Sequence, residues 1–168
     1  KQKMRLRDLF LTKAEWIASR WAIVRGGIIG FLTGIIPAGG ITTASFLAYL
    51  SEKRLSKHPE RFGTGAIEGV AAPEAANNAA STSSFVPLLT LGIPGNASIA
   101  MIFVALMIHG IRPGPLLLQE RPNLFWGVIA SMFFGNLMLV IINMPLIGIW
   151  VRLLNVPYRM LYLIILVI

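Results

Sequence analysis

The sequence contains no cysteine and few acidic residues. Without cysteine, these 168 residues can form neither a disulfide framework nor a thiolate metal site. Charged residues make up only 13% of the chain and hydrophobic residues 55%, a balance that excludes an ordinary soluble domain. We therefore expect an all-α polytopic membrane protein, because helices satisfy their backbone polar groups inside a bilayer.

The positive charge of the chain does not indicate a nucleic-acid partner. The net charge is +8, but the basic residues gather within residues 1–25 and between Lys53 and Arg61, as is typical of the flanks of membrane spans. They are not interleaved with the aromatic and polar groups that read nucleic acids. Residues 1–25 alternate basic and apolar side chains, which predicts an amphipathic segment on the cytoplasmic membrane face, with a solvated linker as the alternative. Residues 26–168 form the predicted membrane domain.

The first interruption of that domain is predicted at Pro37-Ala38-Gly39-Gly40, near the middle of the uncharged segment 26–50. Basic residues flank both ends of the segment, so the positive-inside rule favours a re-entrant hairpin with two half-length arms over a single kinked span. At its tip we expect a substrate site, because helix N-termini and glycine backbone favour anions. Tight helix packing is the alternative for the same residues. The predicted site residues here are Gly39, Gly40, Thr42 and Thr43.

A second interruption is expected at Pro73, which should kink or stop a helix that begins near Ala66. Glu74 and Asn77 are candidate ion-coupling residues, because a carboxylate at membrane depth is by default a functional group and an amide oxygen can bind a cation. Asn77 and Asn78 are candidate substrate-binding residues. A helix cap at Glu74 and interhelical hydrogen bonds from the asparagines are the alternatives.

The third interruption is expected at 92–95, Gly-Ile-Pro-Gly, inside the long uncharged segment 75–111. Asn96 or Ser98 should cap the helix that follows, and Gly95, Asn96 and Ser98 are predicted to bind substrate at its N-terminus. A plain turn between two helices is the alternative. Residues 124–151 then form a predicted membrane span. We do not expect an enzyme, because neither histidine lies near the Ser81–Ser84 hydroxyls in sequence.

With these residues in view, the chain resembles the TctA family, the large permease subunits of the tripartite tricarboxylate transporters. The resemblance rests on long sequence words: GIIGFLTGIIPAGG at 27–40, the run 48–80, VPLLTLGIPG at 86–95 and HGIRPGPLL at 109–117. Two positions depart from the family pattern. Ala38 stands where a glycine is usual, and 81–84 reads Ser-Thr-Ser-Ser where glycines are usual.

The resemblance implies a secondary active transporter that imports citrate or related carboxylates by symport across the bacterial inner membrane. It also implies two partners, a small four-span membrane subunit and a periplasmic solute-binding protein, with Na⁺ or H⁺ as coupling ion and no other cofactor. The chain starts without Met and stops inside an apolar run, so we expect a multi-pass piece from the second half of a longer permease. A non-transporting membrane scaffold is the alternative function.

Overall fold

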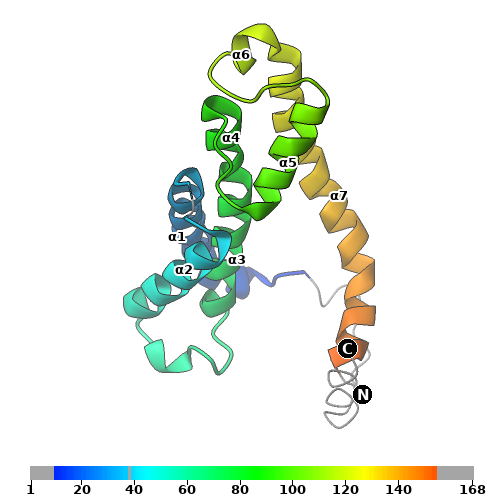
Figure 1. Ribbon diagram of the computed structural model, residues 1–168. Helices are drawn as coiled ribbons and strands as arrows, with labels where there is room; N and C mark the ends of the chain where they lie inside the picture. The colour runs from blue at the N-terminus through cyan, green and yellow to red at the C-terminus, as the bar shows by residue number, and fades with distance from the viewer. Residues whose placement is uncertain (1–9, 38, 155–168) are drawn as a thin grey trace, which may run out of the picture. The chain divides into compact units, whose positions relative to one another are not determined.

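The computed structural model describes residues 10–37 and 39–154, and within them every regular element is a helix (Figure 1). The prediction of an all-α chain is confirmed for this part of the sequence. The α-helices are α1 (Lys13–Ile35), α2 (Ile41–Leu55), α3 (Glu68–Ser83), α4 (Phe85–Leu91), α5 (Ala97–Ile108), α6 (Leu117–Glu120) and α7 (Pro122–Leu154), with the 3₁₀ helix η2 at Pro59–Arg61.

The chain divides into two compact units. One unit, Thr12–Ile129, contains α1 to α6 and the start of α7, and the other contains residues 1–11 and 130–168. Within the described residues, one helix is long and apolar enough to cross a membrane, at Pro122–Ile149 of α7. The predicted span at residues 124–151 is therefore confirmed as helical. That the chain crosses the membrane several times remains a prediction.

Small residues bring α1 and α3 into close contact. Every fourth residue of α1 at its contact with α3 is a glycine, and the facing residues of α3 are alanines at the same spacing. A Cβ atom built on Gly30 would lie 2.6 Å from the Cα atom of Ala76, nearer than any real Cβ contact. Glycine at this spacing therefore lets the two backbones touch, as small residues do in membrane proteins. The facing pairs are Gly26–Ala72, Gly30–Ala76 and Gly34–Ala80, so α1 and α3 run parallel.

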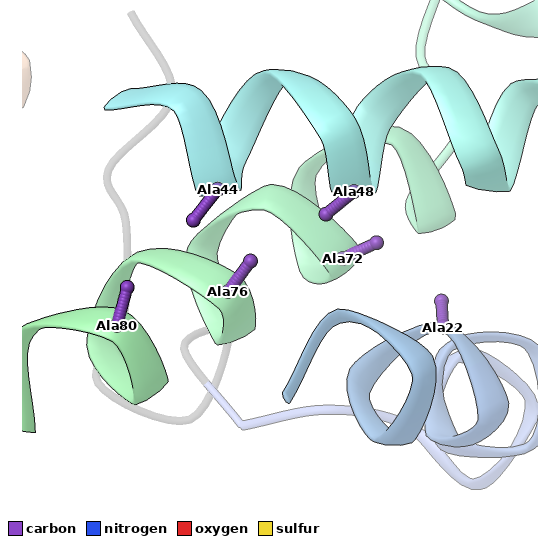
Figure 2. Close-up of a cluster of buried hydrophobic side chains, with 6 residues drawn as sticks. All are labelled: Ala22, Ala44, Ala48, Ala72, Ala76 and Ala80. Atoms are coloured by element: carbon purple, nitrogen blue, oxygen red, sulfur yellow. The ribbon is translucent and has the colours of Figure 1, made fainter. Parts of the chain in front are cut away.

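The second helix, α2, packs on α3 in the opposite direction. Ala44 and Ala48 of α2 are fully buried and point toward the alanines of α3 (Figure 2). The hydroxyl of Ser45 donates a 3.3 Å hydrogen bond to the carbonyl of Pro73. Helices α1, α2 and α3 thus share a core made almost entirely of alanine side chains, which permits close approach and leaves little room for bound molecules inside it.

A partly buried ion pair joins α1 to α2. The guanidinium of Arg25 donates from Nε to Oε2 of Glu52 at 2.8 Å and from Nη2 to Oε1 at 2.5 Å. The Glu52 side chain is only 5% exposed, whereas that of Arg25 is 41% exposed. The two-pronged geometry fixes the orientation of both side chains, so it holds the end of α2 against the middle of α1.

Pro73 was predicted to kink or stop its helix, and the structure shows that it does not stop it. Helix α3 runs from Glu68 to Ser83 with Pro73 inside it. The proline removes one backbone donor, but neighbouring helices can stabilise such a helix when they pack closely around it. Here α1 and α2 hold Ala72 and Ala76 on either side of the proline in the buried core. The residues Pro73–Asn78 are therefore part of a continuous helix, and the chain does not break there.

The predicted first arm of the hairpin is part of a longer helix, and its length within the membrane stays a prediction. Helix α1 has 23 residues and passes through the expected boundary at residue 25 without interruption, because Arg25 and Gly26 both lie inside it. α1 and α2 do form a helical pair joined near Pro37–Gly40, as expected. The membrane-surface position of the first segment and the re-entrant course of the pair remain predictions.

Candidate functional site

The loop between α1 and α2 is compact, and its glycines have specific reasons to be there. Gly39 donates its N–H to the carbonyl of Ile36 at 2.9 Å, and a side chain at Gly39 would collide with that carbonyl. Gly40 precedes α2 with a φ of 72°, a conformation that favours glycine. Because Gly40 has no side chain, no side-chain hydrogen bond caps the first N–H groups of α2.

The predicted break between α4 and α5 is confirmed. Helix α4 ends at Gly92 in the left-handed conformation, and the chain continues without helical structure until Asn96. The side-chain oxygen of Asn96 accepts a 3.0 Å hydrogen bond from the N–H of Ile99, so Asn96 is the N-cap of α5. Gly92 also lies against the carbonyl of Pro113, where a Cβ atom would come within 2.6 Å of that oxygen. The break is thus held by the loop that follows α5.

These two loops meet beside the C-terminal end of α3. A Cβ atom built on Gly95 would lie 3.9 Å from the Cα atom of Pro37. The amide of Asn96 donates to the hydroxyl of Ser84, which separates α3 from α4, at 3.4 Å. The α1–α2 loop, the start of α5 and the end of α3 therefore lie together. We call this place the loop junction. Three helices begin there, α2, α4 and α5, and two end there, α1 and α3.

Helix α3 carries a polar face that leads toward the loop junction. At 3.6 residues per turn, this face lies opposite the buried alanines. All of its polar side chains are exposed in the structure. The Asn78 amide donates to the Glu74 carbonyl at 2.9 Å and the Thr82 hydroxyl to the Asn78 carbonyl at 3.0 Å, so the recorded bonds stay within the helix. The polar face, as we use the term, consists of Glu74, Asn77, Asn78, Ser81 and Thr82.

The predicted site residues fall into three places. Gly39, Gly40, Gly95 and Asn96 line the loop junction, where they are partly buried. Thr42 and Thr43 lie in the first turn of α2, and Ser98 lies in the first turn of α5, all three with exposed side chains. Glu74, Asn77 and Asn78 lie on the polar face of α3. No recorded side-chain bond joins these three groups to one another, and Ala38 lies outside the described residues.

Two buried hydroxyls at the loop junction were missed by reasoning from the sequence. Ser83 and Ser84 are 3% and 2% exposed, deeper than any of the predicted residues. Ser83 packs against Gly34 of α1, and Ser84 contacts Asn96. The hydroxyl residues at 81–84, where glycines are usual, marked this segment as unusual in the sequence. The sequence did not indicate that Ser83 and Ser84 are buried while Ser81 and Thr82 are exposed.

The described residues hold no group of three or more His, Asp or Glu side chains that could bind a metal ion. Oxygen atoms that could bind a cation are nevertheless present at the end of α3. They are the last carbonyls of the helix, and the exposed amide oxygen of Asn77 lies about two turns earlier on α3. Charge at the loop junction can thus be of either sign, because helix N-termini favour anions and helix C-termini favour cations.

The described part of the chain is all helical, with one apolar helix of membrane-spanning length, close glycine-alanine helix packing and a polar face beside a break between helices. These features are typical of integral membrane transporters. The sequence comparison identifies the family. The whole chain, residues 1–168, matches the family described as "Tripartite tricarboxylate transporter TctA family". The protein belongs to the TctA family, which is a family of transporters and not of enzymes. Together with α7, this family indicates a membrane location.

Two relatives come from Agrobacterium vitis. The "Uncharacterized 52.8 kDa protein in TAR-I ttuC' 3'region" is 54% identical over 158 residues, which cover 94% of this chain and 32% of that protein. The "Uncharacterized protein in TAR-II ttuC' 3'region" is 59% identical over 133 residues, covering 79% of this chain and 55% of that protein. The chain thus spans about a third and about half of the length of these relatives. No solved structure matches it.

Proposed function

We propose that the chain is part of a permease that imports tricarboxylates, such as citrate, or related carboxylates across the bacterial inner membrane. Transport is secondary and driven by symport of Na⁺ or H⁺. A periplasmic solute-binding protein delivers the substrate, and a small four-span membrane subunit completes the transporter. Membership of the TctA family supports this proposal.

The observation that carries the proposal is the contrast between the two sides of α3. One side consists of alanines packed on α1 and α2, and the opposite side is the polar face. Carboxylate and amide groups at membrane depth are costly in lipid, so they face other protein or water-filled cavities. A helix with a fully packed small-residue side and a polar opposite side is suited to line a pathway for a hydrophilic substrate.

In the proposed site, the substrate carboxylates bind at the loop junction and along the polar face. The N-terminus of α2 supplies uncapped backbone N–H groups behind Gly40, and the N-terminus of α5 adds its dipole. Exposed hydroxyl and amide groups supply further donors without placing a second charge in the membrane. The proposed substrate-binding residues are Gly39, Gly40, Thr42, Thr43, Asn77, Asn78, Gly95, Asn96 and Ser98.

The proposed ion-coupling residues are Glu74 and Asn77. They lie three positions apart on α3, so their side chains are neighbours on the polar face. A carboxylate and an amide oxygen together suit Na⁺, whereas the carboxylate alone suits H⁺. Replacing Glu74 by Gln separates these cases, because a glutamine keeps one oxygen ligand but cannot carry a proton.

Uptake of labelled citrate into proteoliposomes tests the function. The full-length permease, its small subunit and the binding protein are reconstituted together, with a sodium gradient, a proton gradient or neither. We expect uptake that requires one of the gradients and falls at least tenfold in Asn77→Ala, the size of effect expected when a polar ligand to a buried charge is lost. Gly27→Ala, at a partly buried position of α1 with no atom within 4 Å of its added Cβ, serves as the control.

Uptake that needs no gradient would contradict secondary transport. Uptake unaffected by Asn77→Ala would remove this residue from the site and leave the asparagines as packing groups. If the wild type folds, binds its partner subunit and takes up neither citrate nor any other carboxylate tested, the scaffold alternative is correct.

A further inference from the structure

The hydroxyl of Ser84 is buried at the point where α3 gives way to α4. It donates to the carbonyl of Ala80 at 2.5 Å and lies 3.2 Å from the carbonyl of Ser81. The Ser84 N–H also donates to the Ala80 carbonyl, at 3.1 Å. A serine that bonds back to the preceding turn competes with the helix and tends to bend it. Ser84 thereby marks the junction between the two helices.

The same hydroxyl accepts a hydrogen bond from the Asn96 amide, twelve residues further along the chain. The other end of that amide is also occupied, since its oxygen caps the N–H of Ile99. A hydroxyl can donate once and still accept, so both bonds at Ser84 can exist together. The result is a continuous chain of hydrogen bonds from Ala80 through Ser84 and Asn96 to Ile99.

This chain of bonds connects segments that are separated by a non-helical stretch. Residues 92–96 are not helical, so no continuous helix holds the start of α5 at a fixed distance from α3. The Ser84–Asn96 bond ties them directly, next to Gly95 and Pro37 at the loop junction. We propose that Ser84 is a positioning residue for transport, which holds Asn96 and the N-terminus of α5 in place beside the α1–α2 loop. This proposal rests on the proposed function.

Ser83 provides a matched control for Ser84. It is equally buried and adjacent in sequence, and its hydroxyl reaches the same Ala80 carbonyl at 3.4 Å. The recorded bonds of Ser83 do not include Asn96. Ser83→Ala and Ser84→Ala thus remove the same atoms at the same depth, but Ser84→Ala alone removes the bond to Asn96. A general effect of losing a buried hydroxyl should appear in both variants.

The kinetic test measures citrate uptake by the reconstituted full-length transporter. We expect Ser84→Ala to raise the half-saturating citrate concentration about three- to tenfold, the effect of one hydrogen bond, with a maximal rate within about twofold of wild type. Ser83→Ala should leave both values within about twofold. Asn96→Ser keeps a capping oxygen but lacks the amide donor, and Asn96 is also a proposed substrate-binding residue, so its half-saturating concentration should rise at least as much as that of Ser84→Ala. The double variant, Ser84→Ala with Asn96→Ser, should be no worse than Asn96→Ser alone, because the bond that Ser84→Ala removes is already lost in Asn96→Ser.

A second measurement does not depend on the substrate. In a permease otherwise free of cysteine, Pro37→Cys and Gly95→Cys lie close enough for an oxidised cross-link to form. We expect the rate of cross-link formation to fall at least about threefold when Ser84→Ala is added. The rate should not change when Ser83→Ala is added. The cross-linking rate can be measured even if citrate uptake by Ser84→Ala is too slow for its half-saturating concentration to be determined.

Equal effects of Ser83→Ala and Ser84→Ala in both measurements would overturn the proposal, as would additive effects in the double variant. Absence of citrate uptake by the wild type counts against the proposed function and not against the positioning role, because the cross-linking rates still decide the latter.

Discussion

Replacing Gly30 by alanine tests whether backbone contact between α1 and α3 holds the helical core together. The added Cβ would lie 2.6 Å from the Cα atom and 2.7 Å from the carbonyl carbon of Ala76. Carbon atoms pack at about 3.5–4.0 Å, so the helices must separate by about 1 Å locally. Overpacking of this kind costs about 1–3 kcal/mol. Alanine also favours the helix over glycine by about 1 kcal/mol, which offsets part of that loss.

Gly27→Ala isolates the packing effect. Gly27 lies in the same helix, but no atom lies within 4 Å of its added Cβ. Both variants gain the same helix propensity, so Gly30→Ala should be less stable than Gly27→Ala by about 1–3 kcal/mol. Thermal unfolding of the full-length permease in detergent measures this difference, and Gly27→Ala should unfold at or above the wild-type temperature. Equal unfolding temperatures for the two variants would refute the contact between α1 and α3.

Two further predictions concern charged groups. Arg25→Gln should destabilise the protein by about 1–3 kcal/mol in the same unfolding assay. The loss is smaller than for a fully buried pair because the arginine is partly exposed. Lys53→Gln, on the exposed surface, should have little effect. A loss no larger than that of Lys53→Gln would contradict the ion pair. At the start of α1, the hydroxyl and N–H of Thr12 donate to Glu15 and lower the pKa of its carboxyl. The ionised Glu15 carboxylate therefore stabilises the fold at pH values above its ordinary pKa, and this stabilisation is lost as the pH falls through its lowered pKa. Thr12→Ala should raise the pKa of Glu15 toward its ordinary value in an NMR titration, and an unchanged pKa would contradict the capping arrangement.

Features that depend on neighbouring residues were predicted well from the sequence. The break at Gly92 and the cap at Asn96 are confirmed, because a left-handed glycine and an asparagine N-cap act within a few residues of themselves. The apolar helix α7 is confirmed for the same reason, since its length and composition are local properties.

Features that depend on distant segments were not predicted. Pro73 was expected to kink or stop a helix, and the helix continues through it because packing against two other helices stabilises it; a kink stays a prediction. Arg25 belongs to the basic residues within 1–25, and nothing in the sequence indicated its pairing with Glu52 across 27 positions. The spacing of Gly26, Gly30 and Gly34 against Ala72, Ala76 and Ala80 was present in the sequence and could have predicted the parallel contact. The roles of the site residues remain predictions.

The central claim is that the polar face of α3 lines a water-filled substrate pathway, and cysteine accessibility tests it most directly. Asn78→Cys and, as a control on the exposed apolar side of α1, Ile28→Cys are introduced singly into a cysteine-free full-length permease in membranes. Labelling uses a membrane-impermeant thiol reagent, with and without citrate. We predict rapid labelling at position 78 that citrate slows, and little labelling at position 28. Equal labelling at the two positions, or labelling at position 78 that no carboxylate slows, would contradict the claim.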